Sequence, residues 1–409
     1  MSPELILLAL VVVTALAFDF TNGFHDTANA MAASIATKAL TPKAAVALCA
    51  VLNLVGALLS VEVALTVTNA VINLQNADGS PRPEVVADGG VQLLLMLLAG
   101  LAGAIIWNLA TWLWGLPSSS SHALFGGLIG ATIAGLGWGG VKWIGDGDKL
   151  DGVVGKVIVP GLMSPAIAMI VALVGTNLVF RVAARLTERY RTKGFRWGQV
   201  GAASLMSLSH GTNDAQKTMG VITLALIASG HWTNTHEVPL WVKLACAVTI
   251  ALGTYLGGWR IIRTMGKGLV EIEPPQGMSA DMSSASVILA SSQLGFALST
   301  THVATGSILG SGVGRPGAEV RWAVAGRMAS AWLTTLPSAA LVGALMYLLG
   351  NALGPGLGSS VVFLLLCGAA VYMWLHSRKE PIGHHNVNDD WSSSKDSGSK
   401  GNDKHEVTV

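Results

Sequence analysis

Long apolar segments separated by short polar stretches follow one another along most of the chain. A helix needs about 20 predominantly apolar residues to cross the hydrocarbon core of a bilayer. The pattern therefore predicts an all-α polytopic membrane protein. The expected single spans include residues 4–38, 44–66, 153–180, 240–259, 328–350 and 359–376.

Polar residues interrupt the first apolar segment in mid-span. Asp19, His25 and Asp26 fall there together with Gly23. A break at a glycine lets backbone groups face a cavity instead of lipid. The pattern therefore predicts a broken helix, interrupted near the bilayer centre.

Two other segments carry a polar sequence between apolar arms. In residues 91–136 this sequence is Leu116–His122, and residues 280–314 have the same layout. The hydroxyl-rich stretch Ser119–Gly126 is matched 180 residues later by Ser299–Gly306. Each segment is predicted to form a re-entrant hairpin with a buried tip.

The acidic motif of the first span is duplicated as well. Phe20–Met31 contains Asp26, and 188 residues after that aspartate the stretch Ser209–Met219 contains Asp214. Each half of the chain therefore has one aspartate motif and one hydroxyl-rich motif that ends in histidine. This duplication predicts two structural repeats.

The distribution of basic residues predicts how the repeats are oriented. Residues 181–196 hold the densest basic cluster, which the positive-inside rule places in the cytoplasm. Counting spans back from this loop places the N-terminus outside, so that the repeats, residues 1–180 and 181–376, have inverted topology. Residues 377–409 are polar and are expected to form a disordered cytoplasmic tail.

Composition supports a membrane protein and gives no sign of other classes. Hydrophobic residues make up 51% of the 409 residues and charged residues 12%, about half the charged fraction of a soluble domain. The net charge of +2 gives no indication of nucleic-acid binding, and we expect no nucleic-acid partner. The three cysteines lie in apolar runs and are interpreted as packing residues.

Inverted repeats with helices interrupted at mid-membrane are typical of secondary transporters, whose site lies between the repeats. The sequence also resembles the inorganic phosphate transporter (PiT) family over residues 5–376. Four motifs in the family's order carry the resemblance. They are Gly23–Ala30, Pro117–His122, His210–Asp214 and Leu298–His302.

The resemblance implies symport of phosphate with a cation. The cation is Na⁺ in one branch of the family and H⁺ in the low-affinity bacterial branch, where the substrate can be a neutral metal–phosphate complex. This chain is more similar to the bacterial branch, because it contains Phe24–Asn29 and Gln216–Lys217 and has no large central hydrophilic domain.

Phosphate in a low-dielectric site needs many hydrogen-bond donors. Hydroxyl-rich hairpin tips supply side-chain donors together with the backbone N–H groups at the start of a half-helix, and both favour an oxyanion. We therefore expect two opposed hairpin tips and two nearby amides to bind phosphate. The candidate substrate-binding residues are Ser119, Ser120, Ser121, Ser299, Thr300, Thr301, Asn29 and Asn213.

Asp26 and Asp214 are interpreted as coupling residues, because a charged carboxylate repels phosphate unless it is neutralised. Each can accept a cation, a proton or the P–OH group. Asn22 is placed in the same coupling group. Asp281 is a second candidate for protonation, with a solvated helix end as the alternative.

Lys217 stands where the first repeat has Asn29. An ammonium group at this position can take the place of a Na⁺ ion or pair with Asp214. One of two cation positions would then be filled by the chain itself, which favours H⁺ as the coupling ion. No residue is assigned to a resident metal ion.

The four motif histidines have two interpretations. They either carry protons or contact metal, or they cap a helix and bond a neighbouring carbonyl. They are His25, His122, His210 and His302.

Other functions stay open at this stage. A Na⁺-coupled phosphate symporter and a permease for sulfate or another oxyanion fit the same scaffold. An intramembrane enzyme built from Ser, His and Asp is disfavoured by the symmetry, so the protein is not expected to be an enzyme.

The expected partners are inorganic phosphate, a coupling cation and membrane lipid, with a homodimer left open. The expected location is the cytoplasmic membrane. No cofactor is expected beyond co-transported H⁺ or Na⁺ and a divalent metal such as Mg²⁺ carried with phosphate.

Overall fold

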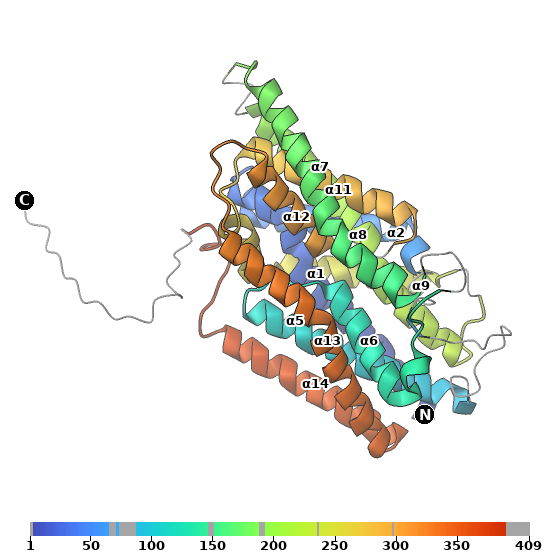
Figure 1. Cartoon of the computed structure of the whole chain (residues 1–409). Helices are drawn as coiled ribbons and strands as arrows, with labels where there is room; N and C mark the ends of the chain where they lie inside the picture. The colour runs from blue at the N-terminus through green and yellow to red at the C-terminus, as the bar shows by residue number, and fades with distance from the viewer. Residues whose placement is uncertain are drawn as a thin grey trace, which may run out of the picture.

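The structure, a computed structural model, describes residues 3–64, 71–72, 87–145, 151–187, 193–234, 237–296 and 298–389. Within these ranges the regular structure is helical, apart from two isolated β-bridges. The principal helices are α1 (Pro3–Ala36), α2 (Pro42–Leu59), α5 (Val91–Leu113), α6 (Ser120–Leu136), α7 (Val159–Ala183), α8 (Phe195–Ala228), α9 (Leu240–Leu256), α10 (Trp259–Arg263), α11 (Pro274–Gln293), α12 (Thr300–Val313), α13 (Trp322–Ala352) and α14 (Pro355–Ser377) (Figure 1).

Six of the described helices are long and apolar enough to cross a membrane. A seventh span is formed if α9 and the helical segment Trp259–Gly268, which meet at a bend of 59°, are taken together. These helices confirm the predicted all-α polytopic membrane protein. The expected span 44–66 is shorter in the structure, because α2 ends at Leu59.

Both predicted hairpins are present. In the first, α5 leads through a short turn into α6, and in the second α11 leads into α12. The second helix of each hairpin begins at a serine cap: Ser119 Oγ accepts a hydrogen bond from the His122 amide at 3.1 Å, and Ser299 Oγ accepts one from the His302 amide at 3.2 Å. With 17 and 14 residues, α6 and α12 are shorter than a spanning helix.

The predicted break in the first helix is wrong. Both α1 and α8 run without interruption for 34 residues through their aspartate motifs. The glycines serve close helix packing instead. A Cβ atom on Gly23 would lie 2.4 Å from the carbonyl oxygen of Ile250, and one on Gly211 would lie 2.3 Å from that of Asn53.

The two halves of the chain pack in matching ways. The contact of α1 with α9 is repeated by α8 with α2, and the hairpin of each half packs on a long helix of the other half: α5 and α6 on α13, α11 and α12 on α7. Figure 1 shows α1 in the middle of the bundle, with α7 on one side and α13 and α14 on the other.

The predicted basic loop, residues 181–196, lies partly outside the described residues, which do not include 188–192. Of the predicted tail, residues 390–409 lie outside them too. Residues 378–389 form turns, and Val387 is buried against the bundle.

Candidate functional site

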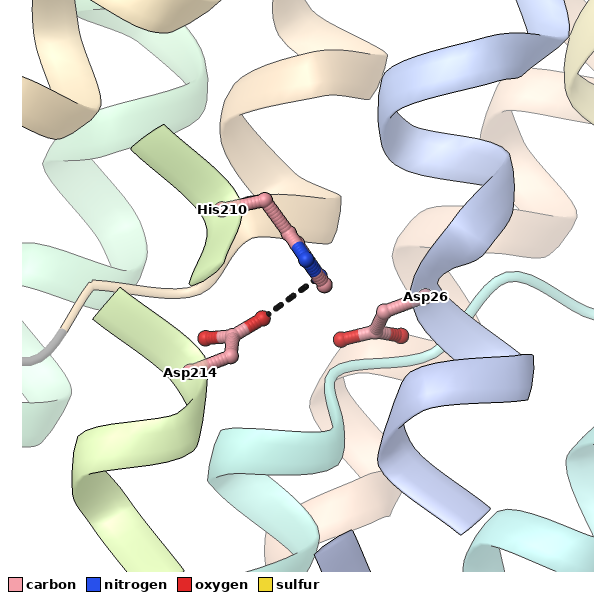
Figure 2. Close-up of side chains that lie close together, drawn as sticks. All are labelled: Asp26, His210 and Asp214. Carbon is pink, nitrogen blue, oxygen red and sulfur yellow. Dashed lines mark ion pairs between the residues drawn. The ribbon is translucent and has the colours of Figure 1, made fainter. Parts of the chain in front are cut away.

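The aspartate motifs and the hairpin tips meet inside the bundle. Figure 2 shows Asp26 on α1 and Asp214 on α8 with their carboxyl groups facing each other, and His210 reaching toward them from α8. Both aspartates and the hydroxyl residues of the two tips are buried. The structure thus brings together segments that are up to 275 residues apart in sequence.

Asp26 is held by groups from three elements. Its Oδ1 lies 2.8 Å from Nδ1 of the adjacent His25 and accepts a hydrogen bond from Ser120 Oγ at 3.1 Å. Thr301 Oγ1, on the other hairpin tip, donates to the same oxygen at 3.4 Å. Both tips therefore contact one carboxylate. His25 Nε2 lies 3.3 Å from Thr111 Oγ1 on α5, which orients the ring.

Asp214 contacts more ionisable groups than Asp26 does. Lys217 Nζ, one helical turn further along α8, donates to its Oδ1. Its Oδ2 accepts a hydrogen bond from Thr300 Oγ1 at 2.9 Å and lies 2.9 Å from His210 Nε2. The Lys217 ammonium compensates the negative charge of this buried carboxylate.

The Lys217 ammonium group is surrounded by oxygen atoms. Besides Asp214, its Nζ donates to Ser121 Oγ at 2.6 Å and to the carbonyl oxygen of Leu298 at 3.1 Å. A carboxylate, a hydroxyl and a backbone carbonyl are oxygen ligands of the kind that hard cations take. The ammonium therefore stands in an environment suited to a bound cation.

The corresponding position in the first repeat is occupied by Asn29. Its Nδ2 donates to Thr300 Oγ1 at 3.2 Å and to Thr301 Oγ1 at 3.0 Å. Its Oδ1 is buried and has no hydrogen-bond partner among the described residues. The two repeats thus differ in charge at one matched position.

Asp26, His210 and Asp214 also form a candidate cation site. One ligand atom from each residue lies within 4.8 Å of the others. Two carboxylates and an imidazole suit several divalent metals. The sequence alone left His210 with two interpretations, proton or metal contact on one hand and helix capping on the other. Its spacing of four residues from Asp214 puts both side chains on one helix face, a signal that could have identified it.

Three predicted residues have no described hydrogen bond to Asp26 or Asp214. Asn213 Nδ2 donates to Ser292 Oγ on α11 at 3.1 Å. Asn22 is buried, and its Oδ1 has no partner among the described residues. Asp281 is buried on α11, so the alternative of a solvated helix end does not hold, and no described hydrogen bond or ion pair joins it to Asp26 or Asp214.

Two of the motif histidines lie behind the hairpin tips. The rings of His122 and His302 stack with centroids 4.8 Å apart, and His302 Nδ1 lies 3.1 Å from the carbonyl oxygen of Gly161 on α7. His122 Nδ1 lies 2.7 Å from Ser119 Oγ. These contacts agree with the interpretation that such histidines bond neighbouring carbonyl and hydroxyl groups.

A buried polar site between two matching halves of a polytopic helical bundle defines a membrane transport protein. Comparisons with known proteins give the family. The phosphate transporter family matches residues 22–193 and 181–343, and the chain belongs to this family.

Similar proteins are named in the same terms. A probable low-affinity inorganic phosphate transporter of Mycobacterium bovis is 57% identical over 399 residues, covering 97% of this chain and 90% of the relative. A protein of Bacillus subtilis with the same description is 42% identical over 347 residues, covering 85% and 98%. The protein is therefore a phosphate transporter and not an enzyme.

A solved structure shares the fold. A protein described as the sodium-dependent phosphate transporter has a TM-score of 0.70 and 20% sequence identity, covering 84% of this chain and 98% of its own.

Proposed function

We propose that this protein imports phosphate in symport with H⁺, with phosphate carried as a neutral complex of a divalent metal. The observation that carries the choice of H⁺ is the position of Lys217. Its ammonium group contacts Asp214, Ser121 and the Leu298 carbonyl, so the chain itself fills one cation position. A second mobile Na⁺ at that position would meet a like charge.

Phosphate is assigned to the space between the two hairpin tips, Ser119–Ser121 and Ser299–Thr301. Both tips begin short helices whose first N–H groups favour an anion. Their hydroxyls now donate to Asp26 and Asp214, and the same hydroxyls supply donors for phosphate oxygens. Asn29 lies beside Thr300 and Thr301 and offers an amide from α1.

The metal part of the substrate is assigned to Asp26, His210 and Asp214. A divalent cation there compensates the negative charge of the two facing carboxylates. Phosphate oxygens can complete its coordination shell. Entry of the anion and the cation together removes the repulsion that phosphate alone would meet beside two carboxylates.

The two repeats are proposed to lie in opposite orientations in the cytoplasmic membrane, with the N-terminus outside and the C-terminus inside. The matching helix contacts of the two halves support a two-fold relation, and the basic cluster at residues 181–196 supports the orientation. In this arrangement the N-terminal end of α1 faces the outside, and the N-terminal end of α8 faces the cytoplasm.

Na⁺ coupling is the second candidate. It is favoured by Asn29 Oδ1, a buried acceptor without a partner among the described residues at the position that corresponds to Lys217. A cation ligated there by Asn29 and Asp26 would leave phosphate as the substrate and change only the driving ion.

The experiment is radiolabelled phosphate uptake into proteoliposomes at fixed membrane potential. A pH gradient and a Na⁺ gradient are imposed separately, each with and without Mg²⁺. Uptake that follows the pH gradient and rises with Mg²⁺ supports the proposal. Uptake that follows Na⁺ and does not depend on Mg²⁺ contradicts the choice of coupling ion and of substrate form.

A further inference from the structure

Asp19 is a buried carboxyl group on α1 that lies outside the substrate cluster. Its side chain is fully buried, and its Oδ1 accepts a hydrogen bond from Thr218 Oγ1 on α8 at 3.0 Å. Its Oδ2 is buried and has no hydrogen-bond partner among the described residues. One carboxyl oxygen is therefore buried without a described hydrogen-bond donor.

No cation among the described residues forms an ion pair with Asp19. By contrast, Asp26 is paired with His25 and Asp214 with Lys217. Asp214 on α8 adds a like charge in its neighbourhood, and Asp19 in turn acts electrostatically on the thiol of Cys246 on α9. An unpaired charge in such a position is expensive, whereas a carboxyl group that holds a proton is neutral.

The second repeat has no copy of this site. The 188-residue offset aligns Asp19 with Ser207 and Thr218 with Ala30, so the Asp19–Thr218 pair is matched by serine and alanine. The Ser207 hydroxyl instead donates to the Ala203 carbonyl of its own helix at 2.7 Å. The same fold is thus maintained at the matched position without a carboxyl group, which argues against a purely structural need for Asp19.

Asp19 is also placed to affect the main site. It lies seven residues before Asp26 on α1, about two helical turns away on the same face. On α8, its partner Thr218 follows Lys217 directly and lies four residues after Asp214. A change of charge at Asp19 therefore acts on the helix turn that holds the Lys217 ammonium group.

We infer that Asp19 is a proton-binding site of the transport cycle, at which a proton on Oδ2 neutralises the carboxylate and is carried with the substrate. The inference rests on the proposed H⁺ symport and assigns the proton to a residue outside the substrate cluster. With the N-terminus outside, Asp19 lies on the outer side of Asp26, where an incoming proton would arrive first. Release to the inside returns the carboxylate to its charged form next to Asp214.

The test separates proton coupling from substrate binding by two assays on the full-length protein. Accumulation of labelled phosphate is driven by a pH gradient. Exchange is measured with equal phosphate, Mg²⁺ and pH on both sides, where no net proton movement is needed. The variants are Asp19→Asn, which keeps the shape, and Asp19→Ser, which copies the residue of the second repeat, with Ser207→Ala as the matched control.

Accumulation by both Asp19 variants is expected to fall by about tenfold or more, within the range of typical coupling free energies, while exchange stays within about twofold of wild type. Ser207→Ala is expected to retain both activities. Full accumulation by either Asp19 variant would overturn the inference, and so would loss of exchange in step with accumulation. A wild-type protein that exchanges phosphate but ignores the pH gradient would instead contradict the proposed function together with the inference.

Discussion

His302 Nδ1 lies 3.1 Å from the carbonyl oxygen of Gly161, the one carbonyl of α7 that Pro165 leaves without its helical donor. Proline has no N–H to offer to the residue four positions before it. The imidazole of the second hairpin supplies the missing donor. This hydrogen bond joins the tip of α12 to the part of α7 that contains Pro165.

His302→Ala is expected to lower stability because it leaves the Gly161 carbonyl buried and unsatisfied, at a cost of about 1–3 kcal/mol. In a Pro165→Ala background the new N–H at position 165 can bond this carbonyl, so the same substitution should cost less. The measurement is thermal unfolding of the four proteins in detergent. The stack with His122 is lost in both backgrounds and cancels in the comparison. Equal costs in the two backgrounds would show that the carbonyl contact contributes nothing.

Lys217→Asn makes the second repeat match Asn29 of the first. Removal of the fixed ammonium opens a position lined by Asp214, Ser121 and the Leu298 carbonyl. We expect phosphate uptake by this variant to become stimulated by Na⁺, by about fivefold or more at fixed pH and potential, a coupling energy near the lower end of the usual range. Lys217→Arg, which keeps the charge, should remain insensitive to Na⁺. A Lys217→Asn protein that is folded but gains no Na⁺ response would contradict the role of a built-in cation.

Gly211→Ala tests the close approach of α8 and α2. Its Cβ would lie 2.3 Å from the backbone oxygen of Asn53, which cannot move aside like a flexible side chain. Overpacking of this kind typically costs about 1–3 kcal/mol, and we expect a lower unfolding temperature. Gly201→Ala on the same helix is the matched control, because a Cβ there meets open space. Helix propensity predicts that the control is neutral or more stable by up to about 1 kcal/mol.

Ser120→Ala removes a hydroxyl that donates to Asp26 at 3.1 Å and that is assigned to phosphate. A hydrogen bond to a charged group contributes about 1.5–3 kcal/mol, so the KM for phosphate should rise by about tenfold or more. Initial uptake rates over a range of phosphate concentrations measure the change. Ser204→Ala is the control, since that hydroxyl bonds the Val200 carbonyl of its own helix. A KM equal to that of the control would remove Ser120 from the phosphate site.

The hairpins and the meeting of the four motifs could be predicted from the sequence because the signals are strong. A run of hydroxyl residues between apolar arms predicts a helix start, and Ser119 and Ser299 are indeed the caps of α6 and α12. Duplication of the motifs indicated that they share one site. The contacts of Lys217 with Asp214 agree with the sequence-based hypothesis.

The continuity of α1 and α8 could not be read from the sequence. The same sequence pattern, a glycine among polar residues, fits both a helix break and the close approach of a neighbouring backbone. Which of the two occurs depends on the helix that packs against it. At Gly23 the deciding partner is Ile250, which is 227 residues away in the chain. The hydrogen bond to the Gly161 carbonyl could not be predicted for the same reason, because its donor His302 lies on a hairpin that is distant in sequence.

A cation that is covalently attached to the chain stays with the protein through every cycle. The Lys217 ammonium can therefore strengthen substrate affinity, but it draws no work from an electrochemical gradient, because it never leaves one compartment for the other. Each mobile ion replaced in this way lowers the highest ratio of internal to external phosphate that transport can sustain. It also frees that transport from the supply of the replaced ion, which is an advantage for a cell whose surroundings are poor in it.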